Sequence, residues 1–173
     1  MNEIVNENAS KIETAMTLLS EVPEEGLHMR QLAQLNESST GFAALLGLRF
    51  TEVTPTCVKA EMPVSDAHLQ VSGVVNGGVY CGIAESVGSI MGIIAAKGKV
   101  VLGVNNNTDF LSSVPAGVIS AEATVIRNGR NTQLINVEMY HRDKLVARTT
   151  LRTMLAPAPV EGNPGRPEDK FSV

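Results

Sequence analysis

A long apolar segment with one charged side chain constrains this chain more than any other feature. Between Asp66 and Lys97 the only formal charge is Glu85, and residues 78–96 have the spacing of one helix. At about 100° per residue, a helical wheel divides this helix into two faces. One face carries large apolar side chains, namely Val79, Ile83, Val87, Ile90, Met91 and Ile94. The other face carries small residues and the single acid, namely Gly78, Gly82, Glu85, Ser89, Gly92 and Ala96.

The small-residue face does not have the composition of a helix surface exposed to water. Solvent faces normally carry Lys, Glu, Arg and Gln. Each interior glycine also costs about 0.8–1 kcal/mol of helix propensity relative to alanine. Repeated glycines on one face indicate that another group approaches the backbone there. Glu85 would then lie in a partly dry place, where a carboxylate can act as a base or a nucleophile. The alternative is an ordinary amphipathic helix on which Glu85 faces water.

Composition limits the classes of function. The chain has 173 residues, of which 43% are hydrophobic, and this is enough for the core of one domain. A net charge of −4 argues against nucleic-acid binding. Residues 118–155 nevertheless carry six arginine or lysine residues against three acids, a local excess that suits a small anionic ligand. Solvated strand faces would explain any single one of these cations equally well.

Cysteines and terminal segments indicate the compartment. Cys57 and Cys81 are too few for a disulfide framework and favour a reducing environment. The first ten residues lack the basic and apolar regions of a signal peptide. The most apolar stretch, 83–96, is shorter than the ~20 residues of a membrane span. We therefore expect a cytoplasmic protein that does not bind membranes. The three histidines, His28, His68 and His141, are scattered along the chain and predict no metal site. They are more readily explained as structural or surface residues.

The order of elements predicts the fold. Residues 1–40 indicate an N-terminal helical extension, and residues 41–155 indicate a larger unit of strands around the central helix. Six runs alternate as strands, at 48–54, 56–62, 100–110, 118–127, 132–141 and 145–155. We therefore predict an α+β fold, in which a curved antiparallel sheet of five to six strands wraps round the one long helix. This arrangement explains why the helix has no charged outer face. Residues 156–173 are rich in proline, glycine and charge, and we expect them to form a disordered tail.

Short connections predict how the strands pair. Neighbouring strands joined by short turns are expected to pair antiparallel, so the last four strands should form a meander. Asn128-Gly129 is a strong hairpin signal, because both residues tolerate positive φ.

This order of elements resembles the hotdog-fold acyl-CoA thioesterases. The resemblance is strongest in Gly73-Val74-Val75-Asn76-Gly77-Gly78, which is followed by an acid eight residues past the first glycine of the Gly-Gly pair. The phenylacetate-pathway and 4-hydroxybenzoyl-CoA thioesterase branch looks most similar. The resemblance covers residues 41–155, and 107–110 and 128–132 also look like that family's later strands and hairpin. It implies a thioester hydrolase acting on acyl-CoA or aroyl-CoA, with coenzyme A as part of the substrate and no other cofactor. It also implies a site between two protomers, and hence a homodimer or tetramer.

Carried over residue by residue, the resemblance implies catalytic roles for five residues. Glu85 would act on water as a base or directly on the thioester carbon. The backbone N–H of Gly77 would bind the thioester carbonyl, since the free amides of a helix start stabilise an oxyanion. Gln70 matches a loop position that carries an amide near the reaction centre, and Ser89 matches a hydroxyl position. Asn76 stands where the family has histidine, and asparagine cannot carry a proton at neutral pH.

The resemblance implies further residues that bind the substrate. Gly78 and Gly82 would let the substrate approach the helix. The phosphates of coenzyme A require arginine side chains and backbone donors. The candidates lie in one predicted hairpin and are Arg127, Asn128, Gly129, Arg130 and Asn131. The preference of turns for these residue types would by itself explain Asn128 and Gly129.

Two departures from the family favour a different function. Gly103 stands where some relatives carry a water-holding hydroxyl, and a glycine holds nothing there. Together with Asn76, it favours a non-catalytic acyl-CoA-binding or sensing protein on the same fold. A hydratase of the same superfamily would use a histidine in the central region, and His68 precedes the helix by too many residues for that role.

Overall fold

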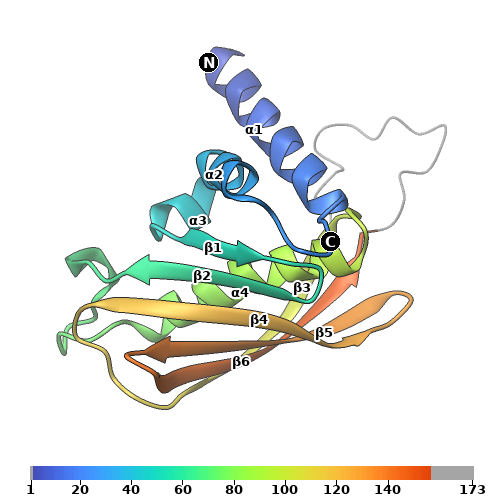
Figure 1. The fold of residues 1–173 in the computed structure, drawn as a ribbon. Helices are drawn as coiled ribbons and strands as arrows, with labels where there is room; N and C mark the ends of the chain where they lie inside the picture. Colours follow the sequence, from blue (N-terminus) through green and yellow to red (C-terminus); the bar gives the residue numbers. More distant parts are fainter. Residues whose placement is uncertain (1, 157–173) are drawn as a thin grey trace.

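The computed structural model describes residues 2–156, in which an antiparallel sheet wraps round one long helix (Figure 1). The α-helices are α1 (Asn2–Ser20), α2 (Met29–Glu37), α3 (Gly41–Leu45) and α4 (Gly77–Ala95), and a 3-10 turn spans Asp66–His68. The strands are β1 (Arg49–Val53), β2 (Cys57–Pro63), β3 (Val101–Phe110), β4 (Val118–Asn128), β5 (Thr132–His141) and β6 (Lys144–Leu155). The predicted α+β hotdog architecture is confirmed. The predicted tail lies outside the described residues, apart from Ala156.

The strand order corrects one prediction. The order across the sheet is β1-β2-β4-β5-β6-β3, so β4, β5 and β6 form a meander but β3 does not join it. β4 pairs with β2 on one side and with β5 on the other, which leaves no free edge for β3. Residues 111–117 therefore carry the chain across the sheet, and β3 pairs antiparallel with β6. As a result, β3 forms one edge of the sheet.

The central helix α4 is covered on its large apolar face by the sheet. Ile83, Val87 and Met91 have no exposed surface. The N-terminal helices cover part of another face, because α1 contacts α2 and α4, while α3 packs on α4. By length and hydropathy alone α4 could cross a membrane, but half of it is buried within this fold.

Glycines in α4 mark places where other elements approach the backbone, as the small-residue face predicts. A Cβ on Gly82 would lie 2.5 Å from Cε1 of Phe42 in α3. A Cβ on Gly92 would lie 2.9 Å from the side-chain oxygen of Gln133 in β5. Alanine at either position would therefore displace a neighbouring side chain.

The hairpin turns differ from the prediction. Positive φ occurs at Arg142 (49°) and Asp143 (63°), the two residues that join β5 to β6, and not at Asn128 or Gly129. A two-residue hairpin loop of type I′ has positive φ at both positions, which matches the twist of the strands. The β4–β5 loop has three residues, 129–131, and is closed by the Gly129 N–H donating to the Thr132 carbonyl at 2.9 Å. The longer loop removes the need for a left-handed residue at its start.

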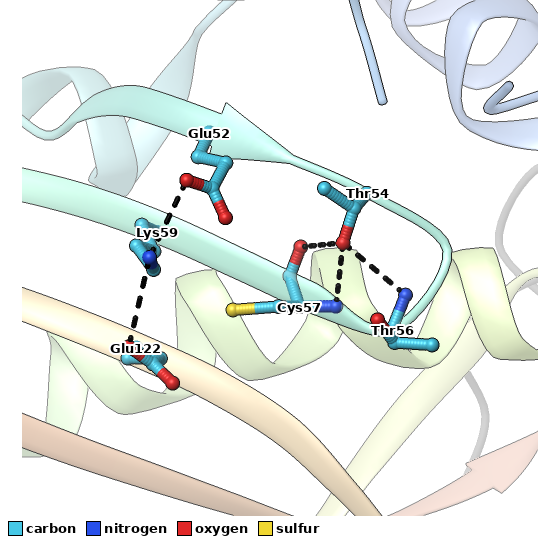
Figure 2. A network of polar contacts seen from close by, with 6 residues as sticks. All are labelled: Glu52, Thr54, Thr56, Cys57, Lys59 and Glu122. Atoms are coloured by element: carbon cyan, nitrogen blue, oxygen red, sulfur yellow. Dashed lines mark hydrogen bonds and ion pairs between the residues drawn. The ribbon is translucent and has the colours of Figure 1, made fainter. Parts of the chain in front are cut away.

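The outer face of the sheet, opposite α4, carries polar side chains near the β1–β2 turn (Figure 2). Thr54 Oγ1 closes this turn by accepting the Cys57 N–H at 2.9 Å. Lys59 lies between two carboxylates, 3.3 Å from Glu52 and 4.0 Å from Glu122. All three side chains are substantially exposed, so these ion pairs contribute about 0–1 kcal/mol each.

Cys57 beside this network should be a poor nucleophile. Burial, with the nearby carboxylate of Glu122, raises the pKa of the Cys57 thiol from 9.0 to about 11. Since only the thiolate reacts, we expect iodoacetamide to label Cys57 about a hundredfold more slowly at pH 8 in the folded protein than in urea. Because the pKa is raised on folding, the associated stability is present below pH 9 and is lost as the pH rises towards 11. A Cys81→Ser background isolates the Cys57 signal, and equal labelling rates in both states would contradict the prediction.

Candidate active site

The start of α4 presents a free backbone amide. Asn76 is the N-cap residue, with extended dihedral angles (φ −67°, ψ 141°) and a side-chain oxygen that accepts the Gly78 N–H at 2.8 Å. Its own N–H donates to the His68 carbonyl at 2.9 Å. Asparagine is among the best N-cap residues, which explains why it can stand here. Within residues 2–156 the next N–H, that of Gly77, has no hydrogen-bond acceptor.

The Gly77 amide lies beside a cavity of about 490 Å³. The structure brings Gln70, another predicted site residue, to the same cavity. Gln70 Nε2 donates to Ser72 Oγ at 2.8 Å, which fixes its amide in the loop before the helix. The ring of Phe110 covers the Gly77 backbone, and a Cβ there would lie 2.9 Å from Phe110 Cζ. Glycine at this position therefore gives Phe110 room against the helix start.

Glu85 lies half-buried on α4, two turns past Gly77. Its Oε2 accepts a hydrogen bond from Asn106 Nδ2 at 3.2 Å, and the same Nδ2 donates to the Cys81 carbonyl at 3.1 Å. Asn106 Oδ1 in turn accepts from Thr108 Oγ1 at 2.8 Å. This chain of hydrogen bonds holds the carboxylate in a defined position beside β3.

Asn106 was not among the predicted site residues. The sheet register shifts between Gly103 and Asn105, where β3 has a bulge. If every second residue from Val101 is assigned to the face towards the helix, the assignment is therefore wrong for the residues after the bulge. After the bulge, Asn106 faces α4 in place of Asn105 or Asn107. Three consecutive asparagines give no change of polarity that would reveal the shift. The polar residues themselves, in the middle of a predicted strand, were a signal that the sequence did offer.

Gly103 has a different role from the predicted one. A Cβ at Gly103 would collide with the Oε1 atom of Glu85, so the glycine leaves the space that the carboxylate occupies. The sequence analysis considered only the missing water-holding hydroxyl at Gly103 and did not predict this contact with Glu85. Gly103 still carries no hydroxyl group to hold a water molecule, so the non-catalytic alternative stays open.

We predict that Gly103→Ala lowers kcat for thioester hydrolysis by about 10²-fold, because a carboxylate displaced by ~1 Å loses that much rate. The release of thiol from an acyl-CoA measures this. The double variant Glu85→Ala/Gly103→Ala should be no slower than Glu85→Ala alone, since coupled residues are not additive. A further loss in the double variant would mean that Gly103 acts independently of Glu85.

The remaining residues of the predicted helix site lie in different surroundings. Ser89 is half-buried one turn past Glu85, and Gly78 is exposed near the helix start. Gly82 is buried beneath Phe42 and Leu46, so its backbone is covered by α3.

The β4–β5 hairpin lies at the other end of α4. Asn128 Nδ2 donates to the Ala95 carbonyl at 2.9 Å, and its Oδ1 accepts from Gln133 Nε2 at 3.1 Å. Asn128 therefore ties the hairpin to the helix end, and a Cβ on Gly129 would lie 2.8 Å from the Thr132 carbonyl oxygen. The three exposed residues that remain available to a ligand are Arg127, Arg130 and Asn131. Within the described part of the chain, no arginine is ion-paired.

The histidines occupy structural or surface positions. His28 is exposed at the start of α2. His68 is buried, and its Nδ1 accepts the Ser65 N–H at 3.1 Å. His141 Nδ1 lies 3.0 Å from the Val118 carbonyl oxygen. Among residues 2–156 no three His, Cys, Asp or Glu side chains gather as a metal site would require.

Gly77 and Glu85 do not face one cavity within a single chain. A rise of 1.5 Å per residue separates them by about 12 Å along the helix axis. The cavity beside Gly77 is lined by neither Glu85 nor Ser89. Reacting atoms must approach to about 3–3.5 Å, so direct attack by Glu85 on a carbonyl held at Gly77 does not fit one chain. The sequence-based expectation that both groups reach one carbonyl from the same helix is therefore not supported by their spacing.

The chain is similar to proteins of one family. Residues 72–147 match the thioesterase superfamily. The protein Rv1847 of Mycobacterium tuberculosis is 40% identical over 116 residues, which cover 64% of this chain and 83% of that protein. The 1,4-dihydroxy-2-naphthoyl-CoA hydrolase of Escherichia coli is 26% identical over 127 residues, covering 72% of this chain and 93% of the hydrolase. The solved structure of thioesterase HI1161 from Haemophilus influenzae has a TM-score of 0.72 and 27% identity, covering 83% of this chain and all of the other (100%).

Proposed function

This chain belongs to the thioesterase superfamily, and we propose that it hydrolyses an acyl-coenzyme A or aroyl-coenzyme A. Water adds to the thioester carbon, the C–S bond breaks, and the products are the free acid and coenzyme A with its thiol protonated. The observation that carries the proposal is the carboxylate of Glu85, which Asn106 holds at 3.2 Å beside the small-residue face of α4. A positioned carboxylate of this kind serves as a general base or as a nucleophile.

The Gly77 amide supplies the second half of the chemistry. Negative charge develops on the carbonyl oxygen when the thioester carbon is attacked. A free N–H at the positive end of a 19-residue helix stabilises that charge. One such donor is worth about 2.7–4 kcal/mol in the transition state. Gln70 and Ser89 are the proposed positioning residues on either side of the reacting group.

We propose that each site takes Glu85 from one protomer and Gly77 from its partner. This is supported by the ~12 Å between the two residues within one chain and by the free edge of β3. Unpaired edge strands are templates for pairing with another chain. The edge and the turn that follows it expose four large apolar side chains, namely Leu102, Val104, Phe110 and Leu111.

Antiparallel pairing of β3 with its own copy would bring the two halves together. Glu85 lies beside Gly103, and Gly77 lies beside Phe110 at the other end of the strand. In a twofold-symmetric antiparallel pair, opposite ends of the two strands meet. A dyad near residues 106–107 would therefore set Gly103 opposite Phe110 of the partner subunit. A dimer is the smallest assembly with a complete site, and a tetramer would contain two such dimers.

The coenzyme A phosphates are the proposed ligands of the exposed hairpin. Arg127 and Arg130 supply donors suited to phosphate oxygens, and Asn131 lies between this arginine pair and β5. Localisation in the cytoplasm, where acyl-CoA is made and used, is part of the same proposal.

Thiol release from a panel of short, long and aromatic acyl-CoAs tests the proposed function. We expect kcat/KM of about 10⁴ M⁻¹s⁻¹ or higher for the best substrate. Binding measured by calorimetry, without release of thiol from any panel member, would contradict hydrolysis and support the non-catalytic alternative.

A further inference from the structure

Two threonine hydroxyls lie behind the asparagine that holds Glu85. Thr108 in β3 and Thr149 in β6 stand directly opposite each other in the strand pairing, and their Oγ1 atoms are 2.7 Å apart. Thr149 is fully buried, and among residues 2–156 its hydroxyl has no other hydrogen-bond partner. A buried hydroxyl that does not donate costs free energy. We therefore expect the Thr149 hydroxyl to donate to Thr108.

The groups around Asn106 determine which way its amide lies. Nδ2 is 3.1 Å from the Cys81 carbonyl oxygen and 3.2 Å from Glu85 Oε2. A backbone carbonyl and an ionised carboxylate can only accept hydrogen bonds, so the N–H groups must face them. Asn106 Oδ1 then faces Thr108 Oγ1 at 2.8 Å. Because an amide oxygen only accepts, the single hydroxyl hydrogen of Thr108 is donated to Asn106.

The two deductions give one direction for the whole chain of hydrogen bonds. Thr149 donates to Thr108, Thr108 donates to Asn106, and Asn106 donates to Glu85. Each bond polarises the next, and the last one ends on a negative charge. The oxygen and nitrogen of an amide are nearly alike in size, so packing alone does not choose between its two orientations. The hydroxyl hydrogen of Thr108 makes that choice from the side away from Glu85.

We propose that Thr108, with its hydrogen directed by Thr149, is a positioning residue for hydrolysis: it keeps the Asn106 amide turned so that an N–H holds the Glu85 carboxylate. This inference rests on the proposed thioester hydrolysis. Thr108 acts through Asn106 and not on the substrate. Without the hydroxyl the amide is free to turn, and the carboxylate loses its fixed place. The chemical step then slows, whereas the binding of the substrate does not depend on this contact.

Two substitutions of Thr108 test the proposal. Valine has the shape of threonine without the hydroxyl, so Thr108→Val should lower kcat by about 10-fold, the loss of one buried hydrogen bond, with KM unchanged. Thr108→Ser keeps the hydroxyl and should recover most of the rate. Stability should rank in the opposite order, because valine keeps the β-branch that favours strands and serine does not. Steady-state kinetics and a thermal melt of each variant separate lost positioning from lost folding.

The same strand offers a matched control. Thr153 in β6 is fully buried like Thr149, and its Oγ1 donates to Gln133 Oε1 at 2.7 Å. Thr153→Val therefore removes a buried hydroxyl of the same kind that belongs to a different set of hydrogen bonds. This variant should keep the wild-type kcat, whatever it does to the melting temperature.

A charge placed at Asn106 gives a second readout. Glu85 has no ion-pair partner among residues 2–156. Asn106→Asp puts a second carboxylate within hydrogen-bond distance of it. Like charges disfavour ionisation, so the acid side of the pH profile of kcat should move to higher pH by about one unit or more. Asn136→Asp adds the same charge to the outer sheet face, where Asn136 Oδ1 accepts from Arg148 Nε at 2.9 Å, and should keep the wild-type profile.

The outcomes separate this inference from the proposed function. If the wild type releases thiol from an acyl-CoA but Thr108→Val is equally fast, or Thr108→Ser is as slow as Thr108→Val, Thr108 does not position the site and the inference is wrong. An unchanged pH profile in Asn106→Asp also contradicts it. If the wild type hydrolyses no acyl-CoA at all, the proposed function itself fails.

Discussion

Replacing Glu85 by glutamine is expected to lower kcat for acyl-CoA hydrolysis by about 10²–10⁴-fold, the usual contribution of a positioned base. Glutamine has the size of glutamate and can still accept the hydrogen bond from Asn106, so the fold and the KM should change little. Only the negative charge and the basic oxygen are removed. Thiol release under saturating substrate, with a thermal melt of each protein, measures both parts of the expectation.

A second carboxylate provides the control for Glu85. Glu122 is partly exposed, and it lies on the outer sheet face beside Lys59. Glu122→Gln should retain the wild-type kcat. Equal rates for Glu85→Gln and the wild type would remove Glu85 from the mechanism.

Removing the amide hydrogen of Gly77 is expected to cost about 10²–10³-fold in kcat, as the loss of one oxyanion donor does. Gly77→Pro deletes this N–H at the first helical position, which is the one that favours proline. The preceding residue must be extended, and Asn76 already is, with ψ at 141°. Steady-state kinetics and the helical circular dichroism signal together check that chemistry is lost while the helix remains.

The control for Gly77→Pro is alanine at the same position. Gly77→Ala keeps the N–H but brings a Cβ to 2.9 Å from the Phe110 ring, a contact that the flexible ring end can relieve. We expect the alanine variant to be much faster than the proline variant. Equally slow variants would mean that crowding of Phe110, and not the lost hydrogen bond, lowers the rate.

Local patterns predicted most of the fold because each element carries its own signal. The change from helical spacing in α4 to alternation in the later strands marks their bounds within one or two residues. The position of β3 in the sheet could not be predicted from these local patterns, because strand pairing depends on which edges remain free and not on chain order. β4 is enclosed between β2 and β5, and this is a property of the whole sheet.

A residue of the candidate site could be predicted from the sequence where its type alone limits the role it can have. Glu85 is conspicuous as the single charge on α4, and the paired glycines mark the helix start. Asn106 was missed because a one-residue bulge changes which side chains face the helix. The contact of Gly103 with Glu85 was missed because it joins β3 to α4, and no local pattern shows which residues of two elements meet. The hydrogen bond of Asn128 was not predicted for a related reason: its acceptor, the Ala95 carbonyl, is 33 residues away in the chain.

Mixing two inactive variants tests the shared site most directly. Glu85→Ala protein lacks the carboxylate and Gly77→Pro protein lacks the amide hydrogen, so neither homodimer has a complete site. When the two are refolded together, half of the dimers are mixed, and one of the two sites in each mixed dimer takes both intact groups. We predict recovery of about one quarter of the wild-type activity, as expected for random twofold dimers. No recovery in the mixture, with mixed dimers shown to be present, would contradict a site built from Glu85 of one protomer and Gly77 of the partner subunit.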